Sequence, residues 1–496
     1  MKKLFRNTFP FILVFTLFSS CKETTMSTQT FETSAAGNKL TEVNCTTKEN
    51  PSVTIKVNAD QPKQTITGFG GSFTQASAYL VNGLGEENRN KVMVAYFGEK
   101  GANYSLTRTH INSCDFSLEN YAYANTPGDT LLKDFSIEKD KEFLIPMIKQ
   151  AQALSKDGFK IISSPWTAPP WMKDNNDWRG GKLLPEYNKT WALYFSKYIE
   201  EYAKEKINIW GITVENEPLG NNSNWESMHF SAQEMTNFVS KHLGPKLEED
   251  KHNVVLLGYD QNRDKELKEW ADVMFKDKES SKYFDGTAVH WYASTYDYFG
   301  ESLEYTHNKA PNKYIIQTEA CADSEVPKWR DDAWYWSKEA TDWGWDWASD
   351  EDKYLHPKYA PVNRYARDII GCLNNWVDGW VDWNMVLDKQ GGPNWFKNWC
   401  VAPVIADIKT DEVYFTPIYF IMSHFSKYIR PGAVILHSEM NNDKLQSVAA
   451  QNPDGSIIIV AFNEGVDQIN YTVELDKEEI KLAIGPQAIQ TTIINN

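Results

Sequence analysis

Short apolar runs rich in β-branched and aromatic residues recur along the chain, and each ends in a cluster of polar, glycine, proline or aromatic residues. Such runs are typical of buried β-strands. Helical patterns lie between most of them; Trp191, Tyr194, Phe195, Tyr198 and Tyr202, for example, fall on one helix face. Alternating strands and helices predict βα units, and eight units match a (β/α)8 barrel better than an open sheet. The predicted strands span residues 65–73, 104–111, 159–166, 207–217, 254–260, 286–292, 314–319 and 379–384.

The pattern changes at both ends of this predicted barrel. Residues 52–57 predict a strand before it, and a turn signal at Asn452-Pro453-Asp454-Gly455 lies within a later series of short strands. Those later strands are predicted at 433–437, 445–451, 456–463 and 469–475. We therefore expect an α/β protein, a (β/α)8 TIM barrel over 61–430 with an appended all-β sandwich over 431–496, joined by N-terminal strands within 38–60.

The first 37 residues predict an export signal and a tether. Lys2, Lys3 and Arg6 precede an apolar run over 9–18 that is too short to span a bilayer, and small residues follow it. Cys21 comes directly after them, as in a lipobox. We expect residues 1–20 to be a lipoprotein signal peptide and Cys21 to be lipidated; a plain signal peptide is the alternative. The Ser/Thr-rich stretch over 21–37 predicts a flexible tether.

The tag Lys22-Glu23 resembles the charged export tag of surface lipoproteins. It favours an exported lipoprotein of the outer membrane or cell surface, with the periplasm as the alternative. Because no later apolar run has transmembrane length, the N-terminal lipid is expected to be the only membrane attachment.

Composition narrows the function classes. The formal charge of −16 argues against a nucleic-acid partner, because phosphate neutralisation needs clustered Lys and Arg. The chain carries 19 Trp, and aromatic rings also serve as platforms in sugar-binding clefts. The cysteines form no C-x-x-C pair, and we expect the mature ones to be mostly buried thiols. The nine His residues show no metal-like spacing, so we expect no metal and no cofactor.

Two carboxylates stand at predicted strand ends, where barrel active sites are built. Glu217 ends the fourth strand and Glu319 ends the seventh. Two carboxyl groups that face one cleft can split a glycosidic bond, one as an acid and the other as a nucleophile or base. Glu215 competes with Glu217, since residues two apart point to the same face of a strand, and spacing alone leaves that choice open.

Other strand ends add polar and aromatic groups. Arg108 is predicted to lie inside the barrel, where it needs an acidic partner, and a pair with Glu319 would keep that carboxylate ionised. Asp115, Trp166, His290 and Trp383 also lie at or just beyond predicted strand ends. Nucleophile-elbow, zinc-protease and Walker motifs are absent from the sequence, which argues against a peptidase or an esterase.

These strand ends belong to a series of motifs that resembles glycoside hydrolase family 30, the family of lysosomal glucosylceramidase and of fungal and bacterial β-1,6-glucanases. The resemblance covers roughly residues 50–496. The matching motifs are Gly68-Phe69-Gly70-Gly71, Ser113-Cys114-Asp115-Phe116-Ser117, Ser164-Pro165-Trp166-Thr167-Ala168-Pro169, Glu215-Asn216-Glu217-Pro218, His290-Trp291-Tyr292, Thr318-Glu319-Ala320-Cys321, Asp382-Trp383-Asn384, Gly391-Gly392-Pro393-Asn394-Trp395 and His424-Phe425-Ser426-Lys427-Tyr428.

The resemblance implies a retaining mechanism with Glu217 as the general acid/base and Glu319 as the nucleophile. It implies a non-proline cis peptide bond after Trp383. It further implies a set of substrate-binding residues, in which Asn216 binds the sugar 2-hydroxyl and Asn394 and Trp395 lie at the cleft edge. That set is Arg108, Asp115, Trp166, Asn216, His290, Tyr292, Trp383, Asn394 and Trp395.

The resemblance implies β-glucosidic hydrolysis more firmly than any one substrate. A surface anchor favours a polymer too large to import, so β-1,6-glucan is expected, with glucosylceramide as the alternative and xylan third. A surface glycan-binding lipoprotein without catalysis is a further alternative, but it would be expected to lack one of the two carboxylates, and both are present.

Overall fold

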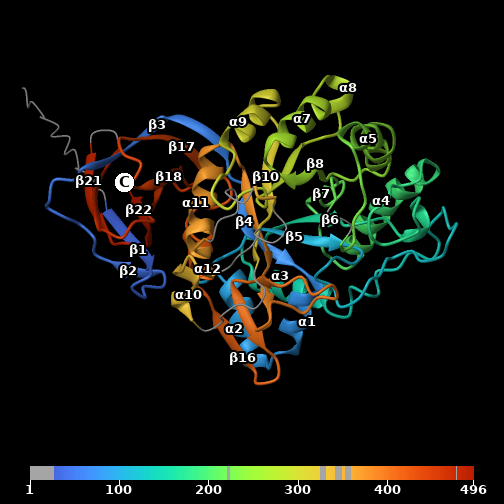
Figure 1. Ribbon diagram of the computed structural model, residues 1–496, viewed down its shortest axis with the longest axis horizontal. Helices are drawn as coiled ribbons and strands as arrows, with labels where there is room; N and C mark the ends of the chain where they lie inside the picture. Colours follow the sequence, from blue (N-terminus) through green and yellow to red (C-terminus); the bar gives the residue numbers. More distant parts are fainter. Residues whose placement is uncertain are drawn as a thin grey trace, which may run out of the picture.

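The computed structural model describes residues 27–220, 224–323, 331–340, 349–351, 359–475 and 478–495. The predicted signal peptide and Cys21 lie outside these residues. Figure 1 shows two parts, a barrel surrounded by helices and a sheet in which N-terminal strands (blue) lie beside C-terminal strands (red). Among the helices described, none combines the length and apolar character needed to cross a membrane.

Eight parallel strands close into a barrel, which confirms the predicted fold class. Every predicted strand is present. The fourth strand is shorter than predicted, because beyond Thr213 the N–H groups of Asn216 and Glu217 bond irregularly to the carbonyls of Pro165 and Asp260. The strands follow one another around the barrel as β4 (Gly68–Phe73), β5 (Leu106–Ile111), β6 (Lys160–Pro165), β7 (Gly211–Thr213), β8 (Val255–Asn262), β9 (Gly286–His290), β10 (Tyr314–Glu319) and β12 (Gly379–Asn384).

Helices cover the outside of the barrel. The aromatic stripe predicted from Trp191 to Tyr202 is confirmed, since its five members are all buried on one helix. The helices are α1 (Gln75–Gly83), α2 (Glu86–Phe97), α3 (Leu144–Leu154), α4 (Asn188–Lys204), α5 (Ala232–Phe238), α6 (Gly244–Glu249), α7 (Lys265–Met274), α8 (Lys278–Ser281), α9 (Gly300–Lys309), α10 (Asp332–Trp336), α11 (Pro361–Asn374) and α12 (Pro417–Ser426).

The barrel interior is a packed apolar layer. It contains Leu106, Ile162, Leu257, Ala288, Ile316 and Val381, one from each of six strands. In β5, Arg108 follows Leu106 two residues later, on the same face of the strand. The polar groups of the barrel therefore begin just above this layer, toward the carboxyl ends of the strands.

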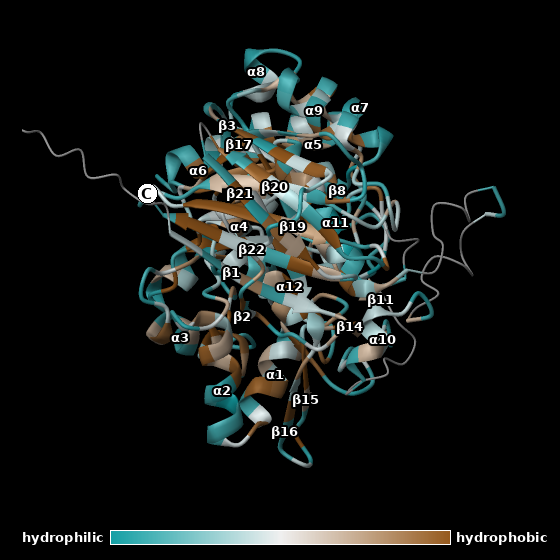
Figure 2. Ribbon diagram, turned by 90° about the vertical axis from the view of Figure 1, so that its left-hand side faces the viewer, coloured by the Kyte–Doolittle hydropathy of each residue, from teal (hydrophilic) through white to brown (hydrophobic). Residues whose placement is uncertain are grey.

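The second part is a nine-stranded sheet built from both ends of the chain. Its own apolar core includes Ile55, Leu436, Ile459, Val473 and Ile494. Figure 2, in which this sheet faces the viewer, shows hydrophobic segments along its strands. The strand order is β2 (Thr41–Val43), β1 (Ser27–Ser34), β22 (Ala488–Asn495), β19 (Ile457–Asn463), β18 (Gln446–Gln451), β17 (Val434–Met440), β3 (Val53–Thr65), β20 (Ile469–Leu475) and β21 (Glu478–Ile484).

Strand β1 shows that the predicted tether over 21–37 is wrong for residues 27–34, while residues 21–26 lie outside the described residues. Its eight residues pair antiparallel with β22, from Ser27 opposite Asn495 to Ser34 opposite Ala488. A Ser/Thr-rich composition does not by itself indicate a flexible segment, because Thr is β-branched and favours strands. Thr30 also bonds to Thr492 through their hydroxyls, at 3.0 Å.

His424 fastens α12 of the barrel to this sheet. Its Nδ1 lies 2.8 Å from Oγ1 of Thr491 in β22, and its Nε2 lies 2.9 Å from Oγ1 of Thr33 in β1. Burial lowers the pKa of His424 to about 3, from an ordinary value of 6.5. The imidazole is therefore neutral at pH 7 and serves as a hydrogen-bonding link between the two parts.

We expect His424 to make stability fall in acid. The unfolded chain binds a proton at this residue below pH 6.5, whereas the folded chain resists it until about pH 3, so stability is lost as pH falls through that window. The slope from this residue is at most about 1.4 kcal/mol per pH unit. Urea unfolding at pH 7, 6 and 5 should show a shallower pH dependence for His424→Asn than for the wild type. Equal slopes would contradict the assignment.

Candidate active site

Two glutamates face each other at the carboxyl ends of the barrel strands. Glu319 is the last residue of β10, and Glu217 lies in the turn that follows β7. A carboxylate oxygen of each, together with a ring nitrogen of His290, lies within 4.8 Å of the others. The side chains are 14 % exposed for Glu217 and 8 % for Glu319, so both are largely withdrawn from water.

Glu217 and Glu215 have different environments in the structure. Glu217 adopts a left-handed backbone with φ of 49°, and its N–H bonds to the Asp260 carbonyl at 2.9 Å. Glu215 is fully buried, and its carboxylate oxygens have no hydrogen-bond partner among the described residues. Burial raises the pKa of Glu215 well above its ordinary value, which favours the neutral acid. Of the two, only Glu217 meets Glu319 in the cleft.

Arg108 links Glu319, Asn216 and Asp260. Its Nη1 donates to Oε2 of Glu319 at 2.5 Å, and its Nη2 donates to Asn216 at 2.8 Å and to Asp260 at 2.7 Å. The predicted pairing of Arg108 with Glu319 is therefore confirmed.

Glu319 is held by a second donor, since Tyr292 Oη donates to its Oε1 at 2.9 Å. Burial raises the pKa of Glu319, while His290 and Arg108 oppose that rise.

Asp260 is the central acid of this network, and the sequence analysis missed it as a site residue. Its carboxylate accepts bonds from Arg108 and from Thr213 at 2.7 Å and from Thr318 at 2.6 Å. Burial would raise the pKa of Asp260, but Arg108 and His290 hold it below its usual range. A bulge between Tyr259 and Gln261 shifts the register of β8 and reorients the chain there. The need of Arg108 for an acid was the one signal in the sequence.

His290 links Asp260 to Glu217. Its Nε2 lies 3.0 Å from Asp260, and its Nδ1 lies 3.3 Å from Oε1 of Glu217. Burial opposes the charged form, but the carboxylates of Glu319, Asp260 and Glu217 prevail and raise the pKa of His290 to about 9. The protonated ring donates from both nitrogens, and so positions the carboxylate of Glu217.

We expect Asp260→Asn to damage both stability and catalysis. Removing one partner of a buried ion pair costs about 3 kcal/mol or more, because Arg108 and His290 would lose the acid that they share and Arg108 would keep only Glu319 as a counter-charge. A displaced Arg108 would also shift Glu319, and misplacement of a reacting group by about 1 Å can lower the rate about 10²-fold. Chemical unfolding and kcat/KM measure the two effects.

The matched control is Asp272→Asn. Asp272 pairs with Lys309 at 2.5 Å on the surface, where such a pair contributes no more than about 1 kcal/mol. If both variants behaved alike, the central role of Asp260 would be refuted.

Trp166 and Trp383 form an aromatic wall beside Arg108. Their rings stack with centroids 5.1 Å apart, and the guanidinium carbon lies 4.9 Å from the Trp166 ring. The prediction of a cis peptide bond after Trp383 is wrong. Among the residues described, the cis bond found is Gly392–Pro393. A trans bond avoids a cost of about 3–4 kcal/mol, and Asn384 still pairs with Ser72 of β4.

The remaining predicted residues lie on the outer rim. Asp115 is buried, and burial raises its pKa well above the usual range, as does the charge of Glu319. Its Oδ2 accepts a bond from Asn398 at 3.1 Å. Asn394 exchanges two bonds with the backbone of Asn398, at 2.6 and 2.9 Å. Asn394 therefore supports the loop, and Asn398, which the sequence analysis missed, is the amide that meets Asp115.

Glu226 joins the rim loops and was also missed. Its Oε2 accepts a bond from Trp395 Nε1 at 3.0 Å, and its Oε1 accepts one from Asn120 at 2.6 Å. Trp395 also donates its backbone N–H to the Ser117 carbonyl. Loops that follow β5, β7 and β12 are thus tied together beside Asp115. One acid in a loop of unknown shape offers no sequence signal for this role.

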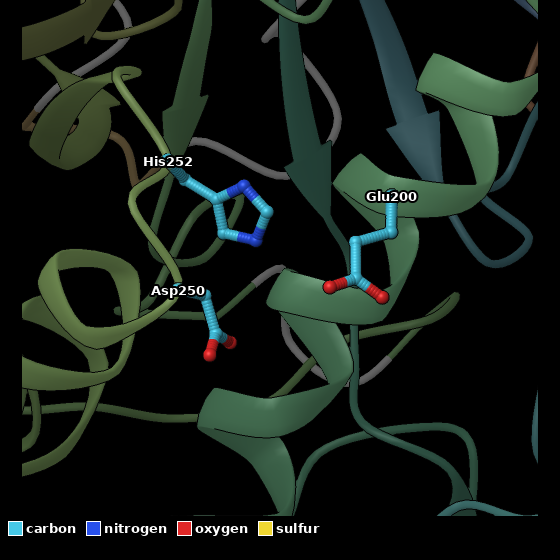
Figure 3. Close-up of side chains that lie close together, drawn as sticks. All are labelled: Glu200, Asp250 and His252. Atoms are coloured by element: carbon cyan, nitrogen blue, oxygen red, sulfur yellow. The ribbon is translucent and has the colours of Figure 1, made fainter.

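A second group of possible metal ligands lies on the outside of the barrel. Glu200 of α4 lies close to Asp250 and His252, which follow α6 (Figure 3). Lys246 already neutralises Asp250 at 2.9 Å, and Ser196 bonds to His252 at 2.9 Å. These contacts make the group a surface network between α4 and α6. The expectation that no metal or cofactor is needed stays a prediction.

Known proteins match this architecture. The glycosyl hydrolase family 30 TIM-barrel domain matches residues 66–429, and the family 30 beta sandwich domain matches 432–492. The chain is 34% identical to lysosomal acid glucosylceramidase of Mus musculus, over 83% of this chain and 77% of that protein. It is 27% identical to endo-1,6-beta-D-glucanase of Neurospora crassa, over 84% of this chain and 82% of the other.

A solved structure agrees with this match. The endo-beta1,6-glucanase BT3312 superposes with a TM-score of 0.79 at 25% identity, over 94% of this chain and 99% of that one. Both domains match in order, and two glutamates meet at the strand ends of the barrel. The chain therefore belongs to glycosyl hydrolase family 30 and is an O-glycosyl hydrolase.

Proposed function

We propose that this enzyme is a retaining hydrolase of β-glucosidic bonds. The observation that carries the proposal is the approach of the Glu217 and Glu319 carboxylates to within 4.8 Å, which fits the separation of about 5–5.5 Å in retaining enzymes better than that of about 6.5–9.5 Å in inverting ones. Glu319 attacks the anomeric carbon while Glu217 protonates the leaving oxygen. Glu217 then takes a proton from water, which releases the sugar from Glu319.

The surrounding residues assist these steps. Arg108 and Tyr292 hold the two oxygens of Glu319, so that its attacking lone pair is directed into the cleft. Asn216 accepts a bond from Arg108, and we assign it to the sugar 2-hydroxyl, a contact that can strengthen in the transition state. Trp166, Trp383 and Asp115 complete the sites for the ring and its hydroxyls.

We propose β-1,6-glucan as the substrate. Two relatives described above are named as endo-1,6-β-glucanases, and one of them superposes over almost the whole chain. The loops beyond the strand ends carry polar side chains suited to sugar hydroxyls, including Asp115 and Asn398. A surface-anchored enzyme would meet such a polymer outside the cell.

Glucosylceramide is the second candidate, and a specific observation favours it. Identity to the mouse glucosylceramidase is higher, at 34%, than to either glucanase. Leu118 and Leu219, which follow Asp115 and Glu217 in the chain, are also exposed. We propose that these two apolar side chains contact the lipid part of this substrate.

The test is a side-by-side assay of the purified enzyme on pustulan, glucosylceramide in detergent, and xylan. Release of glucose or gentio-oligosaccharides from pustulan is expected to be fastest. Proton NMR of the first product should show the β-anomer, which reports retention. If the enzyme cleaved glucosylceramide fastest, glucosylceramide would replace β-1,6-glucan as the proposed substrate. If the first product were the α-anomer, the proposed retaining mechanism would be refuted. No turnover on any of them would favour the glycan-binding alternative.

We also propose that the chain is exported and lipidated at Cys21. The basic start, the short apolar run and the position of Cys21 after small residues support this. In cells fed a labelled fatty acid, the wild type should be labelled and enter the membrane fraction. Cys21→Ser should be unlabelled; equal labelling of the two would refute lipidation there. Protease treatment of intact cells separates a surface location from a periplasmic one.

A further inference from the structure

Two thiols lie together beside the proposed nucleophile. Cys321 follows Glu319 by two residues, and Cys400 begins β14 (Cys400–Val401), which pairs with β11 (Ala322–Asp323). Their Sγ atoms are 3.1 Å apart, and both residues are buried. Among the described cysteines, Cys321 and Cys400 are the pair whose sulfur atoms lie in contact.

We propose that Cys321 and Cys400 are an oxidation site, which closes into a disulfide that fastens the nucleophile strand to the cleft-edge loop. A disulfide needs its sulfurs about 2.0 Å apart, so they must move only about 1 Å closer. The pairing of Ala322 with Val401 already holds the two backbones side by side. Cys114 and Cys372, which are equally buried, contact Ser117 and Asp368 instead.

We expect a small oxidant to reach this pair from the side of the two glutamates, past Tyr292. The half-buried Tyr292 contacts both Glu319 Oε1, at 2.9 Å, and Cys321 Sγ, at 3.5 Å, so one side chain separates the sulfur from the cleft. With hydrogen peroxide as oxidant, the Cys321 sulfur attacks one oxygen, the O–O bond breaks and water leaves, giving a sulfenic acid. The Cys400 thiol then attacks that sulfur, the S–O bond breaks and a second water leaves.

The bond would join segments that are 79 residues apart. On one side, the Cys321 carbonyl accepts a bond from Trp291 Nε1 at 3.2 Å. On the other, the Cys400 N–H bonds to the Gly391 carbonyl and closes the loop that carries Trp395. The disulfide would therefore restrain the loop that carries Trp395 and stabilise the fold.

The test treats the full chain with hydrogen peroxide, blocks remaining thiols under denaturing conditions, and maps peptides without reduction. A Cys321–Cys400 peptide is expected, with Cys114 and Cys372 blocked as thiols. The oxidised wild type should unfold a few degrees higher than the reduced one, and dithiothreitol should reverse the shift. Cys400→Ser should lose the linked peptide and the shift, whereas the matched control Cys372→Ser should keep both.

Three results would overturn the proposal. One is oxidation of Cys321 to the sulfinic or sulfonic acid without a link to Cys400. Another is a linked peptide that involves a different cysteine. The third is a Cys321–Cys400 link that leaves the unfolding temperature unchanged. Since mapping uses the wild-type chain, failure of a variant to fold does not weaken the test, and the proposed substrate does not enter it.

Discussion

Glu319→Gln should abolish turnover, with kcat falling about 10⁴-fold or more on every substrate. The amide cannot attack the anomeric carbon, so no glycosyl-enzyme forms. The loss should be the same for substrates with good and poor leaving groups, because attack fails before the leaving group matters. Steady-state rates on an aryl β-glucoside and on a β-1,6-linked oligosaccharide measure it.

A chemical rescue assigns the role of Glu319 more sharply. In Glu319→Gly, added azide can take the place of the missing carboxylate and should give the α-glucosyl azide in a single displacement. The Arg108 guanidinium remains to draw an anion to the vacated position. Formation of the β-glucosyl azide instead, or turnover near the wild-type rate, would refute Glu319 as the nucleophile.

Glu217→Gln should show a loss that depends on the leaving group. A positioned general acid contributes about 10²–10⁴-fold, so hydrolysis of an unactivated β-1,6 bond should slow by that factor. A dinitrophenyl glucoside needs no protonation, so its first step should remain fast and its phenol should appear as a burst. The second step should then be slow, because Glu217 also activates water. Azide should accelerate it and give the β-glucosyl azide.

Glu215→Gln is the matched control, two residues earlier in the same segment. Glu215 is buried without a hydrogen-bond partner in the described structure, and its raised pKa favours the neutral acid, so the amide is a close replacement. It should show neither the burst nor the dependence on the leaving group. If Glu215→Gln showed them and Glu217→Gln did not, the two roles would have to be exchanged.

The barrel is the part of the fold that the sequence predicts best. Each strand is an apolar run between clear breaks, so its existence follows from local pattern alone. Strand β1 was not predicted. Its Ser and Thr residues are polar and form no apolar run, and its partner β22 lies at the other end of the chain. Pairing between distant segments leaves no local signal in either one.

Some residues of the site could be predicted from the sequence and others could not. Glu319, Arg108 and an acid at the end of the fourth strand could be predicted, because strand ends meet at one face of a barrel and a buried guanidinium needs an acid. The choice of Glu217 over Glu215 came from the family resemblance alone. Asp260 could not be assigned, since its orientation depends on a bulge in β8. Asn398 and Glu226 lie in loops, whose shape depends on contacts with other loops. The approach of Cys321 to Cys400 likewise exists only after the cleft-edge loop has closed.

The pairing of β1 with β22 sets an order for folding. Apart from its pairing with β2, strand β1 has no strand partner among the described residues until β22 is available, and its contact with α12 through Thr33 and His424 also needs a late segment of the chain. The barrel strands all precede them and can close earlier. Strand β1 must therefore wait for a partner that lies more than four hundred residues further along the chain, and a chain truncated before β22 should leave that edge open to aggregation.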